Sequence, residues 1–201
     1  MNLLIIFAIQ AVCAVIATTI HEFSRAVVST LLGDKKPKND GRLTLNPVKH
    51  FEPIGFILMW VTGFGWGKPV ETSQLFYKNR KRDVVITAVM PSVINLAVAA
   101  VAAFIFSRFS LSFGIGIGGT ILTTFLYNIV RMNVSLAVYN IVPVTPMDSI
   151  KVLSAVMPAN SYFKYIQYEK IIQMLFLLCL FMGYTDVIFS PIISFVLNAL
   201  F

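Results

Sequence analysis

The sequence predicts an all-α polytopic membrane protein with about four transmembrane helices and a re-entrant or hairpin-like loop between the first and second. Of its 201 residues, 57% are hydrophobic and only 12% are charged. An ordinary soluble domain is about one-quarter charged. Several stretches of 20 or more residues carry no charge at all. These observations exclude a soluble globular domain, a disordered chain and a disulfide-framed secreted domain, and we expect residues 1–201 to form one membrane domain.

The first span is predicted at the N-terminus. Residues 1–20 contain no charged side chain, and a helix of about 20 residues crosses the ~30 Å hydrocarbon core of a bilayer. The apolar pattern continues beyond the charges at 21–25 to Leu32. We therefore expect one long helix that ends at Gly33, because glycine favours helix C-termini.

The segment 34–83 differs from the rest of the chain. It carries ten of the sixteen Lys and Arg residues and most of the turn-forming dipeptides. Within it, residues 51–66 are apolar and aromatic but interrupted by Pro53 and several glycines. This stretch is too short and irregular to span, so we expect a re-entrant or interfacial segment whose backbone is satisfied by protein or trapped water.

Three further apolar segments follow. Residues 84–107 are uncharged and interrupted only by Pro91, which predicts the second span. The third helix is predicted from about Gly118 to about Ile141, before a proline-rich loop. The last apolar stretch, 171–200, contains a break around Asp186. We expect it to be either one bent span or a span followed by an interfacial helix.

The net charge of +7 arises mainly from the 34–83 segment. Basic loops of membrane proteins remain on the cytoplasmic side. We therefore expect this segment in the cytoplasm of a multi-pass protein of the cell membrane, with the lipid bilayer as its main partner. No basic stripe with interleaved aromatic residues is present, so a nucleic-acid partner is not expected.

Ionisable residues within membrane segments are candidates for function because each is costly unless it is paired. The first cluster is His21-Glu22-Phe23-Ser24-Arg25. A His-Glu-x-x-His helix places two imidazoles on one face as zinc ligands, with the glutamate as general base. Here the fifth residue is Arg25, whose guanidinium offers no lone pair to a metal. The cluster alone also fits a polar helix turn in which Glu22 pairs with Arg25.

The second cluster is Asn140-Ile-Val-Pro-Val-Thr-Pro-Met-Asp148, where a helix ends and two prolines favour an extended stretch. A lone carboxylate, Asp148, follows at membrane depth. It is a candidate third metal ligand arriving from a distant helix, and it is equally a helix-capping residue before Lys151.

Taken in order, these segments resemble the site-2 protease family of intramembrane zinc metalloproteases, in particular its compact bacterial branch without a PDZ domain. The resemblance covers nearly the whole chain. It rests on His21-Glu22, on Leu32-Gly33-Asp34, and on the 140–148 element. Four intervening motifs match as well: Gly41-Arg-Leu-Thr-Leu-Asn-Pro47 followed by His50, Pro53-Ile54-Gly55, Gly65-Trp-Gly-Lys-Pro-Val70, and Asn79-Arg-Lys-Arg-Asp83.

The resemblance implies a zinc endopeptidase that cleaves transmembrane segments of other membrane proteins. It gives Glu22 the role of catalytic base and His21 and Asp148 the role of zinc ligands. Arg25 stands where the family has its second histidine. Other departures are Ser149 after the loop aspartate, where the family has glycine, and Met90 before Pro91, where it also has glycine. Pro91, Asn95, Asn140 and His50 are implied to line the substrate cleft.

Three functions remain open on the sequence. The first is a catalytically impaired family member, a pseudoenzyme that binds membrane helices without cleaving them. The second is an active intramembrane zinc endopeptidase with an unusual ligand set, in which His50 supplies the missing ligand. The third is a small transporter with a polar pathway formed by Glu22, Arg25 and Asp148, although the paired broken helices of transporters are missing.

A buried arginine at membrane depth needs a partner. We therefore expect Arg25 to replace the metal, because its guanidinium matches carboxylate geometry. The sequence predicts that it pairs with Asp148, Glu22 or both. The oligomeric state and the identity of any substrate do not follow from the sequence.

Overall fold

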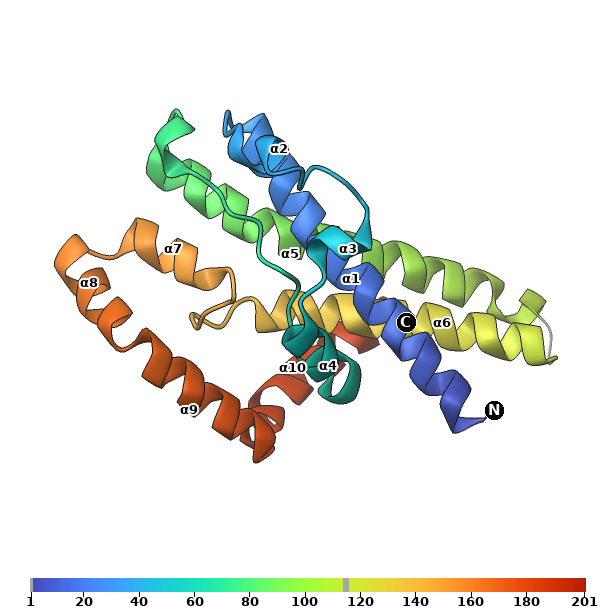
Figure 1. Cartoon of the computed structure of the whole chain (residues 1–201). Coiled ribbons are helices and arrows are strands. Elements are labelled where there is room, and N and C mark those ends of the chain that lie inside the picture. The colour runs from blue at the N-terminus through green and yellow to red at the C-terminus, as the bar shows by residue number, and fades with distance from the viewer. Residues whose placement is uncertain (1, 114–115) are drawn as a thin grey trace.

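The computed structural model describes residues 2–113 and 116–201 (Figure 1). The described residues form α-helices and two short 3-10 helices, without a strand. Three helices are long and apolar enough to cross a membrane: α1 (Leu3–Leu31), α5 (Arg80–Phe109) and α6 (Ile117–Tyr139). The pair α9 (Glu169–Phe181) and α10 (Tyr184–Leu200) passes the same test together. The chain is therefore an all-α polytopic membrane protein, as the sequence predicted.

Helices α1, α5 and α6 form the centre of the molecule (Figure 1). Small side chains line their contacts, including Ala14 and Ala17 of α1 and Ala99 and Ala103 of α5, all of them buried. Small residues allow membrane helices to approach closely, so that packing and interhelical hydrogen bonds stabilise the bundle. This three-helix core fixes the relative positions of the polar side chains described below.

The segment between α1 and α5 contains four short helices: α2 (Lys36–Asn39), α3 (Pro47–His50), α4 (Pro53–Thr62) and the 3-10 helix η1 (Gln74–Phe76). Helix α4 begins at Pro53. The preceding residue, Glu52, caps it: the Glu52 side chain accepts a hydrogen bond from Gly55 N at 2.5 Å. It ends at Thr62, and the following residue, Gly63, has a φ of 79°, the left-handed conformation that glycine favours at a helix C-terminus.

Contacts with α1 show how residues 51–67 run along that helix. Trp60 Nε1 donates a hydrogen bond to Phe7 O at 2.8 Å, near the start of α1. Gly67 then lies against Thr18 and Glu22, well along the same helix. Phe7 and Thr18 are eleven residues apart, or about 16 Å of helix. Helix α4 has only ten residues, too few to span, and the prediction that residues 51–66 are re-entrant or interfacial stays a prediction.

The observed boundaries of the later helices differ from the prediction in detail. Helix α5 begins at Arg80 rather than Val84, because Asn79 caps it by accepting a hydrogen bond from Arg82 N at 3.3 Å. Pro91 lies inside α5 without ending it. Helix α6 begins within one residue of the predicted Gly118.

The C-terminal part of the chain bends sharply. Helices α9 and α10 meet at an angle of 76° next to Gly183. Two amphipathic helices, α7 (Ser149–Val156) and α8 (Ala159–Gln167), connect α6 to α9. Helix α10 then returns to pack on α6 (Figure 1).

The fold predicts how single cysteines will react with a membrane-impermeant reagent. In a chain with Cys13→Ala and Cys179→Ala, the exposed positions Lys38, Lys78 and Ser112 are each replaced by cysteine. We expect K38C and K78C to react from the cytoplasmic side and S112C only from the opposite side, because α5 separates them. Reaction of S112C from the same side as K38C would contradict the predicted topology.

Candidate metal site

Helix α1 presents three ionisable side chains to the interior of the bundle. His21, Glu22 and Arg25 are 3%, 3% and 1% exposed. His21 and Arg25 are four residues apart, so they share one face of the helix, and Glu22 is three residues from Arg25. The sequence prediction that these residues form one cluster is consistent with this burial.

Asp148 reaches the cluster from the loop after α6. The side chain of Asn140 at the end of α6 fixes this loop: its Oδ1 accepts a hydrogen bond from Asp148 N at 3.1 Å. Its Nδ2 donates to Leu136 O at 2.8 Å. Ser149, which stands where the resembled family has glycine, donates its hydroxyl to Asn140 O at 2.7 Å. Asn140 therefore positions Asp148.

The Arg25 guanidinium lies between the two acidic groups. Nη1 donates a hydrogen bond to Glu22 Oε2 at 2.7 Å. Nη2 forms an ion pair with Asp148 Oδ1 and lies 3.2 Å from His21 Nε2. Arg25 thus pairs with both predicted carboxylates, and it connects α1 directly to the loop after α6.

His21 is held at both ring nitrogens. Nδ1 donates to Asn95 Oδ1 at 2.9 Å, because the amide nitrogen of Asn95 itself donates to Asn133 Oδ1 at 2.7 Å. His21 Nε2 lies 2.9 Å from Asp148 Oδ2. A hydrogen bond to one ring nitrogen commonly orients the other toward a ligand. Here the oriented nitrogen faces Asp148 and Arg25.

Glu22 has a second partner in the extended stretch that follows residues 51–67. Its Oε2 accepts a hydrogen bond from Val70 N at 2.8 Å in addition to the one from Arg25. The backbone can approach because position 67 is glycine: a Cβ there would lie 3.1 Å from Glu22 Cγ and 3.1 Å from His50 O. The only carboxylate suited to act as base in this cluster is therefore already bonded to a guanidinium and to a backbone amide.

The charges around Asp148 stabilise its ionised form. Burial alone would raise its pKa, but Arg25, His21 and Lys151 together outweigh that effect, and the pKa lies below the usual range of aspartate. Lys151 Nζ lies 3.8 Å from Asp148 Oδ1. Burial, together with repulsion by Arg25, lowers the pKa of Lys151 to about 8. Asp148 therefore remains a carboxylate across the neutral pH range.

The remaining predicted site residues occupy different environments. His50 lies in the turn before the re-entrant segment, where its Nε2 contacts Thr44 O at 2.7 Å and its Nδ1 lies 3.5 Å from Arg42 Nη2. The structure does not bring it to His21 and Asp148 as a third ligand. Pro91 is buried in α5, one turn before Asn95.

The donor atoms do not fit a zinc ion. A tetrahedral zinc with bonds of about 2.0–2.1 Å holds two of its ligand atoms roughly 3.3 Å apart. His21 Nε2 and Asp148 Oδ2 are closer than this, at 2.9 Å, and contact each other directly. The position where a third zinc ligand would lie is occupied by a cation, the guanidinium of Arg25. Within residues 2–113 and 116–201, no three His, Cys, Asp or Glu side chains are grouped to hold a metal.

Comparison with known proteins gives the family of the chain. It is 31% identical over 158 residues to a Bacillus subtilis (strain 168) protein named "Putative zinc metalloprotease YwhC", and the match covers 77% of this chain and 72% of the relative. No family model matches the chain. No solved structure matches it either. The chain therefore belongs to the metalloprotease family of this relative.

Two residues of the site, Val70 and Asn133, were not identified from the sequence. Val70 contributes only its backbone N–H, which any residue except proline would provide. Asn133 bonds to Asn95 from the middle of α6. A buried polar residue in an apolar helix was the available signal for Asn133, because such residues seek partners on neighbouring helices.

The hydrogen bonds of Asn95 predict a stability effect. Asn95→Ala removes the acceptor of His21 Nδ1 and the donor to Asn133, so we expect a loss of about 1–3 kcal/mol in the free energy of unfolding. The matched control is Asn128→Ala in α6, because the Asn128 amide donates within its own helix, to Thr124 O at 2.8 Å. Thermal unfolding in detergent measures the melting temperature of each variant, and we expect the lower value for Asn95→Ala. Equal melting temperatures for the two variants would contradict the prediction.

Proposed function

We propose that this protein is a non-hydrolytic relative of the site-2 proteases, in which Arg25 replaces the zinc ion as the group that joins α1 to the loop after α6. It is a multi-pass protein of the cell membrane. Its former catalytic cleft binds a transmembrane segment of a client membrane protein without cleaving it.

One observation carries the proposal: the guanidinium contacts Glu22, Asp148 and His21 from the position of the second motif histidine. Three protein ligands plus one water make up a typical catalytic zinc site. Two candidate ligands, His21 and Asp148, remain in this cluster, and each of them contacts the other and Arg25. Glu22 is itself held in place, since its Oε2 already accepts hydrogen bonds from the Arg25 guanidinium and from Val70 N.

The binding role rests on the family and on the polar interior of the bundle. Proteins of this type, by resemblance, receive a membrane helix between their own helices. In this chain the buried amides of Asn95 and Asn133 provide such a polar interior. Loss of a metal ligand removes hydrolysis but leaves the helix-binding surface unaltered.

The name of the Bacillus relative favours a second function, that of an active zinc endopeptidase with an unusual ligand set. It requires a third ligand and a displaced Arg25. The contacts of His50 with Thr44 and Arg42 argue against His50 as that ligand.

Metal analysis separates the two functions. We expect the unmodified protein, purified after growth with zinc, to contain far less than one zinc per chain. Arg25→His completes the set of two histidines and Asp148, so we expect this variant to bind zinc stoichiometrically and to release it to a chelator. Arg25→Lys is the control, because it keeps the positive charge without gaining an uncharged imidazole donor.

A second measurement checks the activity itself. The unmodified protein is incubated in detergent with a model substrate that has one transmembrane helix. We expect the substrate to stay intact. Stoichiometric zinc in the unmodified protein, together with chelator-sensitive cleavage, would overturn the proposal in favour of the active endopeptidase.

A further inference from the structure

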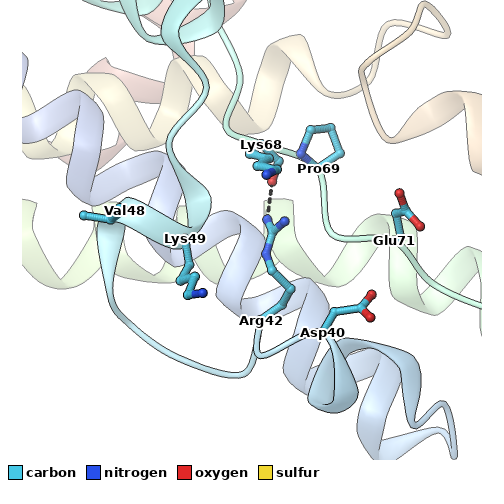
Figure 2. A pocket seen from close by; sticks show the side chains of 7 residues that line it. All are labelled: Asp40, Arg42, Val48, Lys49, Lys68, Pro69 and Glu71. Carbon is cyan, nitrogen blue, oxygen red and sulfur yellow. Dashed lines mark hydrogen bonds between the residues drawn. The ribbon is translucent and has the colours of Figure 1, made fainter.

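A polar cavity of about 510 Å³ lies between the turn that follows α2 and the end of the re-entrant segment (Figure 2). Its charged lining residues are Arg42, Lys49 and Lys68 on the basic side and Asp40 and Glu71 on the acidic side. None of these side chains belongs to the cluster around Arg25. The cavity is therefore a second candidate site, on the face formed by the 34–79 segment.

Arg42 is the fixed element of this cavity. Its side chain is only 9% exposed, and it reaches across to Lys68 O, to which Nη2 donates a hydrogen bond of 2.5 Å (Figure 2). Within the described part of the chain, Arg42 Nε is buried without a hydrogen-bond partner. A buried guanidinium is costly without a counter-charge, and an anion in the cavity that Arg42 lines would supply one.

The balance of charge also favours an anion. Glu71 is already engaged, because its Oε2 forms an ion pair of 2.7 Å with Lys36 Nζ. Asp40 is the remaining acid on the rim. Lys49 and Lys68 are both exposed and have flexible side chains that can turn toward a ligand. The planar guanidinium of Arg42 and two lysines match the oxygen atoms of a phosphate group.

The position of the cavity relative to the bilayer indicates where the phosphate comes from. Leu45 and Pro47 line a small apolar groove together with residues of α1 between Val15 and Ile20. Those residues of α1 lie within the first 20 or so, the length that spans the hydrocarbon core. The same turn also exposes Leu45 and Val48, which are 61% and 78% exposed. Apolar side chains beside lysines are typical of a surface that rests on a membrane.

We propose that this cavity binds the phosphate of an anionic phospholipid headgroup, with Arg42, Lys49 and Lys68 as the contacting cations and Leu45 and Val48 inserted among the acyl chains. The site is independent of the question of zinc at the other cluster. It also bears on that cluster, because Arg42 holds the carbonyl of Lys68 two residues before Val70, whose N–H binds Glu22.

Native mass spectrometry of the full chain in detergent tests the proposal with phosphatidylglycerol and phosphatidylcholine as probes. We expect the unmodified protein to retain phosphatidylglycerol in preference to phosphatidylcholine. Lys49→Gln and Lys68→Gln should each weaken the binding of phosphatidylglycerol roughly fivefold, which is the effect of one cation close to an anionic headgroup. Both side chains are exposed, so the variants should fold normally.

The matched controls are Lys38→Gln and Lys78→Gln, which remove exposed lysines of the same segment that do not line the cavity. They should leave the affinity unchanged. Equal retention of the two lipids, or an equal effect of the control variants, would overturn the proposal. Soluble glycerol phosphate tests whether the phosphate belongs to a lipid or to a free phosphate ester. If it displaces phosphatidylglycerol at equal concentration, the ligand is a free phosphate ester and the proposal is overturned.

Discussion

The structure depends on the pairing of one buried cation. Arg25 is 1% exposed on a helix that crosses the membrane, and a guanidinium in that environment is stable only with partners at hydrogen-bond distance. Glu22 supplies one partner from the same helix, and Asp148 supplies the other from the loop after α6. Removal of one member of such a pair leaves the other charge buried and uncompensated.

The neighbouring elements converge on this pair. Asn95 of α5 holds His21, and Asn133 of α6 holds Asn95. Asn140 fixes the loop that carries Asp148, and Val70 ties the re-entrant segment to Glu22. Three spans and two loops are therefore connected through one polar cluster. The guanidinium of Arg25 lies at the centre of this cluster, and under our proposal it takes the place of a zinc ion.

Much of this arrangement could be predicted from the sequence. Uncharged stretches of about 20 residues located the spans, because burial of an ionised side chain in hydrocarbon is so unfavourable. The interruption of residues 51–66 by proline and glycine predicted that this segment would not cross. Pairing of Arg25 with Glu22 and Asp148 followed from the cost of an isolated buried charge together with the resemblance to the site-2 proteases.

Other features depended on three-dimensional packing and could not be predicted. The bond from Val70 N uses a backbone group, so no residue type marks it. The rotation of α5 that turns Asn95 toward His21 depends on how alanines of α1 and α5 pack, and the spacing of residues in one helix does not determine it. The sequence offered His50 as a possible third ligand, yet the fold directs its imidazole to Thr44 and Arg42.

A double-mutant cycle between Arg25 and Asp148 tests the central claim most directly. The unfolding free energies of Arg25→Gln, Asp148→Asn and the double variant are compared with that of the unmodified protein. The cycle on the exposed pair Lys36 and Glu71 serves as the control, since exposed pairs contribute about 0–1 kcal/mol. If Arg25 takes the place of the metal, each single change costs about 3–5 kcal/mol, and the double variant loses less than their sum by about 1–3 kcal/mol. Additive losses, with a coupling no larger than that of Lys36 and Glu71, would contradict the account.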